Sequence, residues 1–237
     1  MRDPYLYEDV DVLSNLANIK NSEELQEFEA EITKCTMLGI YKRTFEKFDS
    51  ATLKEIHELI FGQIYSWAGE FRKIDISKSE VVLGGDTVYY SHYRNIKKDL
   101  DQCMKEIKHL KPKGNNDDDT VFRLTRIIPA IWQVHPFREG NTRTCIVFGV
   151  LLAKSLGFSV NHDLLKDKAA YVRNSLVWAS QGIYSRYDYF EDIFFDAVLG
   201  KKKNTGADQK SENNYEKIGD YEVKNYKEQP HKYIEGK

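Results

Sequence analysis

The chain has 237 residues, of which 41% are hydrophobic and 30% are charged, and its formal net charge is -2. This length allows a sizeable core and predicts one domain, and the composition excludes wholesale disorder. A net charge so close to zero gives no general electrostatic reason to bind nucleic acid or an anionic membrane surface.

The sequence carries no pattern of a membrane or export segment. Its start, MRDPYLYEDV, lacks the cationic and apolar regions of a signal peptide, and no run reaches the roughly 18 apolar residues of a spanning helix. We expect a cytoplasmic protein with no membrane partner, and translocation as an effector stays open. Cys35, Cys103 and Cys145 are an odd number without metal-ligand spacing, which favours small, buried, reduced thiols.

Helices separated by short turns are expected up to residue 66. Asn21 or Ser22 can cap a first helix, because acidic residues and then apolar residues at helical spacing follow. Asp49 or Ser50 can cap a second over residues 51–67, which carry an apolar stripe. Both are expected to pack against a core.

The periodicity changes at residues 72–90, where Ile, Val and Tyr flank Gly84-Gly85-Asp86. Short β-rich runs around a Gly-rich turn predict a hairpin. A two-stranded hairpin is marginal alone, so this one must lean on the helices, and its outer edge stays free to pair with another chain.

Helical pattern returns after the hairpin. Helices are expected at 91–110, at 120–134 with Asp119 as cap, at 143–156, at 163–180 and at 186–199. Residues 143–156 are apolar almost all round, which indicates a helix buried in the middle of a bundle. Residues 200–237 mix charge, Asn and Gly with few aliphatic residues, so we predict a flexible C-terminal tail.

The run VHPFREGNTRTCIVF joins an amphipathic helix to the buried one. Pro136 should end the first helix near His135, because proline disfavours helical backbone in the preceding residue. Gly140 and Asn141 tolerate a tight turn, and the next helix starts directly after them. Backbone N–H groups and a helix dipole therefore point into this loop, which makes an anion site.

Three side chains around that site suit transfer of a phosphate-containing group. The His135 imidazole can take a proton from a hydroxyl, the Glu139 carboxylate can hold Mg²⁺, and Arg143 can neutralise phosphate charge. Such catalysis consists mostly of positioning and charge stabilisation. The loop therefore predicts phosphoryl-type transfer from a metal-bound nucleotide.

Residues 135–143, HPFREGNTR, resemble the Fic family motif HPFx(D/E)GN(G/K)RxxR. The resemblance implies a mostly α-helical, Fic-type bundle with a β-hairpin flap next to the active loop. It would place a Fic domain at 1–199, with N-terminal helices at 1–66, the flap at 72–90 and a catalytic helical core at 91–199. It also implies a protein adenylyltransferase that moves AMP from ATP, with Mg²⁺, onto a Ser, Thr or Tyr hydroxyl of a target protein.

The family's roles pass to this chain position by position. His135 is similar to the general base and Glu139 to the Mg²⁺ ligand. Gly140 and Asn141 resemble the anion hole for the α- and β-phosphates, and Arg143 resembles the phosphate-stabilising arginine. Phe137 corresponds to the residue that packs the loop into the core, whereas Arg138 is interpreted as a surface or pocket-rim charge.

Two positions depart from the motif: Thr142 replaces Gly or Lys, and Ile146 replaces the second arginine. That arginine helps to hold the γ-phosphate in the family and pairs with a regulatory glutamate. Two alternatives to an adenylyltransferase therefore stay open. One is a non-catalytic Fic-like regulator that binds nucleotide or a partner, and the other is a transferase with a different donor, such as a kinase-like or phosphocholine-transferring enzyme.

The stretch IYSWAGEFRKIDISKSE at 64–80 is similar to the lead into the family's flap, which aligns the target by strand pairing. The resemblance makes Lys78 a nucleotide-facing candidate, with an ordinary exposed lysine as the alternative. It makes Val82, Leu83, Gly84 and Gly85 the target-docking edge.

Aromatic residues near the flap and in the tail have structural interpretations. Tyr89, Tyr90 and Tyr93 are expected to pack between flap and helix rather than to form a base-stacking platform. The tail tyrosines are interpreted as scattered aromatics rather than self-modification sites. The final HKYIEGK faintly resembles the family's inhibitory motif (S/T)xxxE(G/N), but the glutamate lacks its arginine partner, so a separate antitoxin-like protein or no inhibition is expected.

Overall fold

The computed structural model describes residues 2–200. Its helices are α1 (Ser22–Ile40), α2 (Ser50–Phe61), α3 (Ile96–Lys105), α4 (Asp117–Val134), α5 (Asn141–Ser155), α6 (His162–Asp167), α7 (Ala169–Trp178) and α8 (Asp188–Leu199). Two strands, β1 (Lys78–Ser79) and β2 (Thr87–Val88), pair antiparallel. Single 3₁₀ turns lie at Val81–Leu83, Tyr93–Asn95, Glu106–His109 and Gly182–Tyr184.

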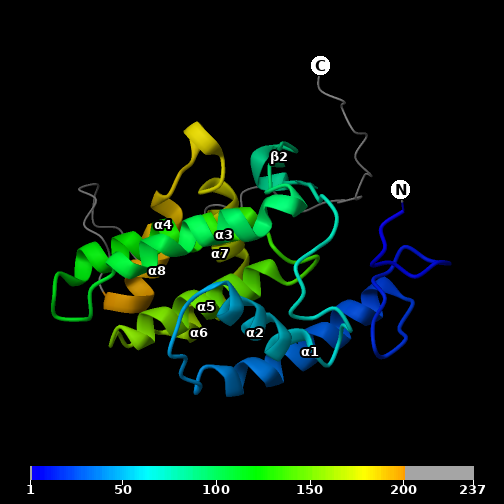
Figure 1. Cartoon of the computed structure of the whole chain (residues 1–237), viewed down its shortest axis with the longest axis horizontal. Helices are drawn as coiled ribbons and strands as arrows, with labels where there is room; N and C mark the ends of the chain where they lie inside the picture. Colours follow the sequence, from blue (N-terminus) through cyan, green and yellow to red (C-terminus); the bar gives the residue numbers. More distant parts are fainter. Residues whose placement is uncertain (1, 201–237) are drawn as a thin grey trace.

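The buried helix predicted at 143–156 is α5, which lies in the middle of the molecule. Figure 1 shows α1 and α2 on one side of α5 and α3 and α4 on the other. Helix α4 packs on α3, α5 and α8, and α2 packs on α1 and α5. The α5 side chains from Thr144 to Ala153 are all buried, as a helix surrounded on most sides requires. The expected mostly α-helical bundle with one small hairpin is therefore confirmed.

The N-terminal caps follow the chemistry of the sequence. The Asn21 side chain accepts hydrogen bonds from the backbone N–H groups of Glu23 and Glu24, and Asp49 does the same for Ala51 and Thr52. Each side chain satisfies two of the N–H groups that a helix start leaves without intrahelical partners. Of the alternatives at each site, Asn21 and Asp49 are the caps.

Three helix predictions were wrong in detail. The helix expected over residues 51–67 ends at Phe61. Helix α4 begins after Asn116, which has left-handed backbone, so Asp119 lies inside the first turn and pairs with Arg123 (2.9 Å) instead of capping. The helix expected at 163–180 breaks at Lys168 (φ −106°, ψ 32°). The break lets α6 pack on α8 while α7 packs on both α4 and α8.

The predicted hairpin is confirmed in outline, but its strands are only two residues long. The Glu80 N–H donates to the Asp86 carbonyl (2.8 Å), and the Gly85 N–H donates back to the Glu80 carbonyl (3.0 Å). These bonds close the turn at Glu80, so Val82 and Leu83 form a 3₁₀ turn and not a strand edge. The prediction that strand-like residues continue up to Gly84 was therefore wrong.

The stem of the hairpin also lacks the ladder that the β-rich composition suggested. The carbonyls of Ile74 and Ser91 both accept hydrogen bonds from the buried guanidinium of Arg72. Because these groups are satisfied by a side chain, the two chain segments run beside each other without pairing as strands.

The predicted tail after Gly200, with its tyrosines and the HKYIEGK stretch, lies outside the described residues. Within residues 2–200, no helix has the length and apolar character that crossing a bilayer demands.

Candidate active site

The active loop, residues 135–143, connects the end of α4 to the start of α5. Helix α4 stops at Val134, as predicted from Pro136, and His135 adopts left-handed backbone with φ of 51°. Its N–H donates to the Trp132 carbonyl (3.0 Å). Left-handed backbone is uncommon for a residue with a side chain, so the loop holds this histidine in a conformation that the chain would not adopt unaided.

The His135 ring is half-buried, and two aromatic side chains fix its orientation. It stacks on Tyr90 with centroids 3.8 Å apart and meets Trp132 edge-on at 5.1 Å. Its Nδ1 lies 3.2 Å from the Trp132 carbonyl, so Nδ1 carries the hydrogen and Nε2 keeps its lone pair. Burial, helped by the cations Arg72 and Lys78, holds the pKa of His135 well below its usual value. The ring is therefore a neutral proton acceptor at pH 7.

Asn141 closes the loop with its side chain. It accepts from the Phe137 N–H and donates to the Phe137 carbonyl, both at 2.9 Å, while the Phe137 ring is fully buried. Thr142 accepts a hydrogen bond from the Trp132 indole (2.9 Å), which ties the helix start to the end of α4. What Asn141 offers to an anion is thus its backbone N–H, because no side chain caps α5 and its first N–H groups have no intrahelical partner.

Gly140 has no room for a side chain. Its φ is +77°, and a Cβ built on it would lie 2.3 Å from the Phe61 ring. The Gly140 N–H donates to Oε1 of Glu139 (2.9 Å), which orients that half-buried carboxylate beside the helix start. The turn that sequence analysis expected is therefore held by packing against α2 as well as by backbone freedom.

His57 of α2 contacts the active loop, although sequence analysis gave it no role. The Gly69 N–H donates to its Nδ1 (2.8 Å), so Nε2 carries the hydrogen and donates to the Glu139 carbonyl (3.1 Å). Its ring stacks on Phe137 at 3.8 Å. Burial lowers the pKa of His57 to about 4, which keeps the ring neutral and this double contact intact.

The buried, neutral state of His57 predicts acid sensitivity. The unfolded chain binds this proton near pH 6.5 and the folded chain only near pH 4, so the free energy of unfolding should fall by about 3 kcal/mol across that window. Urea unfolding of wild type and His57→Gln at several pH values checks this. Gln can keep both hydrogen bonds but does not titrate, so its pH slope should be shallower. The exposed His109→Gln is the control, and equal slopes in wild type and His57→Gln would contradict the assignment.

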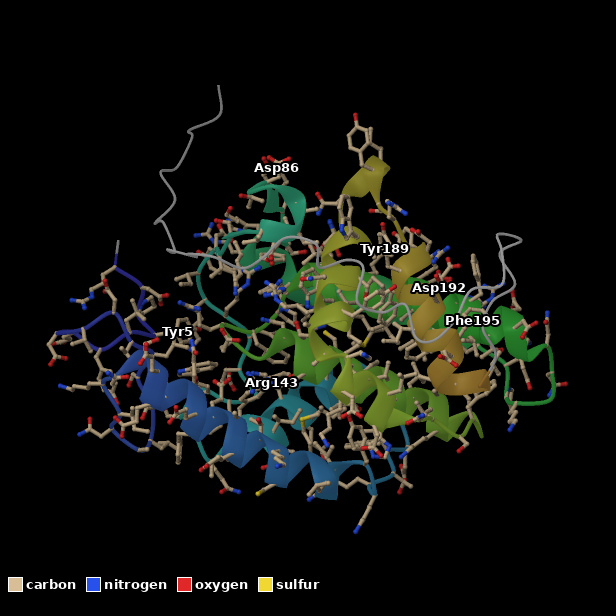
Figure 2. The ribbon with its side chains drawn as sticks, turned by 180° about the vertical axis from the view of Figure 1, so that it is seen from behind. Tyr5, Asp86, Arg143, Tyr189, Asp192 and Phe195 are labelled. Atoms are coloured by element: carbon tan, nitrogen blue, oxygen red, sulfur yellow. The ribbon has the colours of Figure 1, made fainter. Side chains whose placement is uncertain are left out.

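Arg143 points from α5 toward α1, where a set of partners holds it. Figure 2 shows Arg143 between α1 and the centre of the bundle. Its guanidinium pairs with Glu29, donates to the Thr33 hydroxyl (3.2 Å) and lies 4.7 Å from the centre of the Phe61 ring. Tyr65 donates to the other Glu29 oxygen (2.6 Å). Sequence analysis missed Glu29, because nothing in an amphipathic helix marks one glutamate as the partner of a residue far along the chain.

The flap residues lie at different depths. Lys78 is exposed on β1, Val82 and Leu83 are half-buried in the 3₁₀ turn, and Gly84 and Gly85 are exposed at the tip, next to Asp86 at the periphery of the molecule (Figure 2).

An ion pair between a buried carboxylate and a half-buried arginine fixes the flap to the bundle. The Glu80 carboxylate is 3% exposed and lies 2.8 Å from the Arg173 guanidinium of α7. Removing Arg173 would leave the Glu80 charge buried without compensation. The flap is therefore attached at its turn, which no local sequence pattern indicated.

Several smaller expectations meet mixed outcomes. Tyr90 packs against the site as expected, but Tyr89 is 85% exposed, so its predicted packing role was wrong. Cys35 is exposed, which contradicts the expectation that it is a buried thiol. Arg138 pairs with Asp3 at the edge of the loop (2.7 Å). Ile146, at the position of the motif's second arginine, is buried in the core.

Glu139 is the side chain of the loop that suits a divalent cation. Within residues 2–200 no cluster of three or more His, Cys, Asp or Glu residues surrounds a common point. A single carboxylate fits Mg²⁺, because this ion keeps several waters and binds through one or two carboxylates together with substrate phosphates. With Oε1 held by Gly140, the second carboxylate oxygen has no partner in the loop.

Residues 47–153 match the model of the Fic/DOC family. Among similar proteins, the protein adenylyltransferase VbhT of Bartonella schoenbuchensis is 31% identical over 172 residues, 68% of this chain and 33% of that protein. A protein adenylyltransferase of Bartonella henselae is 27% identical over 85% of this chain and 40% of its own length. The probable protein adenylyltransferase Fic of Escherichia coli K12 is 27% identical over 71% of this chain and 80% of its own length. The chain thus spans well under half of the two Bartonella relatives.

Solved structures agree with the fold. BepC of Bartonella tribocorum, solved with AMPPNP bound, has a TM-score of 0.69 and 23% identity, covering 84% of this chain and 97% of that one. The type IV secretion system effector protein BepA has a TM-score of 0.68 and 24% identity, covering 86% and 75%. These likenesses establish a common fold.

Proposed function

Because the chain belongs to the Fic/DOC family, we propose that it is a protein adenylyltransferase that moves AMP from ATP onto a Ser, Thr or Tyr hydroxyl of another protein. Relatives that carry this name support the reaction class. The ATP analogue bound to the structurally similar BepC supports ATP as donor.

The observation that carries the proposal is a neutral histidine in the same nine-residue loop as an uncapped helix start. Nε2 of His135 takes the proton of the target hydroxyl, and the hydroxyl oxygen forms a bond to the α-phosphorus. The bond between the α-phosphorus and the pyrophosphate oxygen breaks, and pyrophosphate leaves. The first N–H groups of α5, including that of Asn141, stabilise the phosphate charge, together with Arg143.

Glu139 is the proposed Mg²⁺ ligand. The ion, when bound, neutralises phosphate charge, and the loop positions the carboxylate through the Gly140 N–H. The Glu139→Gln variant keeps an oxygen for Gly140 but loses the negative charge, so the Mg²⁺ concentration for half-maximal rate should rise roughly tenfold or more. Mg²⁺ titration of the labelling rate checks this, with the exposed Glu46→Gln as control. An unchanged Mg²⁺ requirement in Glu139→Gln would exclude Glu139 as the Mg²⁺ ligand.

Transfer of AMP is tested by the position of the label. Purified protein is incubated with Mg²⁺, cell lysate and ATP labelled at the α- or the γ-phosphate, and parallel reactions contain UTP, GTP or CDP-choline. Label on protein from α-labelled ATP only is the expected result. Label from γ-labelled ATP would indicate a kinase, and label from another donor would indicate a different transferase.

A nucleotide-binding regulator is the second candidate, and one contact and one substitution favour it. Arg143 is paired with Glu29, and Ile146 provides no second guanidinium. Binding of ATP in calorimetry without label from any donor, and with the same affinity in Glu139→Gln, would select this function over the enzyme.

The remaining assignments belong to the same proposal. Residues 1–199 act as one Fic domain, with Lys78 facing the nucleotide and the flap residues Val82 to Gly85 contacting the target. A separate antitoxin-like protein would have to reach Arg143 or the active loop to inhibit transfer. We place the activity in the cytoplasm, where ATP is available, and an effector or toxin role fits the type IV secretion effectors of the same fold.

A further inference from the structure

Arg72, between α2 and the flap, is a buried cation that sequence analysis gave no role. Its side chain is fully inaccessible, and its nearest carboxylate, on Asp75, lies 3.6 Å away. The guanidinium donates mainly to backbone carbonyls, which also stabilise its charge. A buried arginine with so many main-chain acceptors is an organising group for the segments it binds.

One set of these acceptors is the end of α4. Nε donates to the His135 carbonyl (2.8 Å), and Nη2 lies 3.4 Å from the Val134 carbonyl. The backbone N–H of Arg72 donates to the Pro136 carbonyl (2.8 Å). Three consecutive carbonyls around the left-handed His135 are thus bound by one residue. A helix end leaves its last carbonyls without intrahelical partners. Arg72 supplies hydrogen bonds at this helix end while His135 keeps its left-handed backbone conformation.

The other set is the stem of the flap. Nη1 donates to the Ile74 carbonyl (2.6 Å), before β1, and Nη2 donates to the Ser91 carbonyl, after β2. Tyr90, the neighbour of Ser91, is the residue on which the His135 ring stacks. The same guanidinium therefore binds the backbone of His135 and the backbone next to Tyr90, its stacking partner.

We propose that Arg72 is a positioning residue that fixes the imidazole of His135 relative to the flap, through simultaneous hydrogen bonds to the end of α4 and to both sides of the flap stem. This inference rests on the proposed transfer reaction. Arg72 touches neither nucleotide nor target in this scheme, and it acts through the geometry of His135.

The planar fork of arginine is essential to this role. Its donors diverge in one plane and reach two separate segments, whereas lysine ends in one compact ammonium. In Arg72→Lys the charge is kept but the two segments lose their common link. A displacement of about 1 Å at a reacting group can cost roughly a hundredfold in rate. We expect kcat for AMP transfer to fall about 10- to 100-fold, with KM for ATP changed less than about threefold.

The kinetic test compares wild type, Arg72→Lys and the control Arg123→Lys, each at a temperature well below its melting point. Arg123 is 44% exposed on α4 and pairs with Asp119 at the surface, so its variant should keep the wild-type rate. Unchanged kcat in Arg72→Lys, or a rise in KM alone, would overturn the proposal.

Hydrogen exchange gives a readout that does not depend on turnover. Amides at 132–138 and at 73–92 should both exchange at least about tenfold faster in Arg72→Lys, because both segments lose the same anchor. Faster exchange in only one segment would overturn the link. If wild type labels no protein, the proposed function fails, and hydrogen exchange alone decides whether Arg72 joins the segments.

A measurement on wild type covers the case in which Arg72→Lys does not fold. In ¹⁵N-labelled protein, the Arg72 Nε–H should exchange slowly and show nuclear Overhauser contacts to the Hα of His135, with the Nη protons showing contacts to the Hα of Ser91. Absence of either contact would contradict the arrangement.

Discussion

Replacing His135 by Asn should reduce the rate of AMP transfer by about a thousandfold while leaving ATP affinity within about threefold of wild type. General-base catalysis contributes roughly 10²- to 10⁴-fold, and Asn has no group that accepts the hydroxyl proton. Asn is chosen because it tolerates left-handed backbone, and its amide can still donate to the Trp132 carbonyl. The measurement combines single-turnover labelling with calorimetry of ATP binding.

The controls for this variant separate chemistry from folding. His135→Ala should lose activity equally but also some stability, since the stack on Tyr90 and the contact to Trp132 disappear. His109→Ala, at an exposed position, should keep the wild-type rate. Because the pKa of His135 is held low, the wild-type rate should not fall between about pH 8 and pH 6. If His135→Asn kept more than a tenth of the wild-type rate, His135 would be excluded as the general base.

The helices could be predicted because their signals are local. Asn21 and Asp49 precede acidic or apolar-periodic residues, and the continuous apolar run of α5 leaves only a central position for that helix. The break at Lys168 could not be predicted, because residues with good helix propensity lie on both sides and the turn is imposed by packing of α6 and α7 on α8.

The active loop was predicted from its own nine residues, but its supports lie elsewhere in the chain. His57, Arg72 and Glu29 contact the loop or Arg143 from 82, 63 and 114 residues away in sequence. A histidine, an arginine and a glutamate in ordinary helical or turn sequence carry no local mark of these contacts. Only the fold brings them to the loop, and two of them bind main-chain carbonyls that every residue possesses.

In the hairpin, hydrogen bonds from a side chain and a turn outweigh the local preference for β-strand. Ile, Val and Tyr favour strands, yet the Glu80 turn and the Arg72 guanidinium take the hydrogen-bonding groups that a ladder would need. The flap is therefore shaped by two buried charges, Glu80 with Arg173 and Arg72 with carbonyls, and only secondarily by β propensity.

Replacing Gly140 by Ala should destabilise the fold by about 2–5 kcal/mol. Left-handed backbone costs a residue with a Cβ about 1–2 kcal/mol, and overpacking a tight contact adds about 1–3 kcal/mol. Both costs apply here, because φ is +77° and the new carbon would lie 2.3 Å from the Phe61 ring. Urea unfolding gives the free energy of unfolding of wild type and variant.

The two contributions at Gly140 can be separated with variants of the same chain. Gly84 has a similar φ of +68° and nothing within 4 Å of its added Cβ, so Gly84→Ala should cost only the backbone share, about 1–2 kcal/mol. Adding Phe61→Leu to Gly140→Ala should make the double variant less destabilised than the sum of the singles, because the two positions share one contact. Equal costs for Gly140→Ala and Gly84→Ala would show that α2 does not press on the loop. In that case the orientation of Glu139 and of the α5 start would depend on the hydrogen bonds of the loop and its neighbours and not on packing against Phe61.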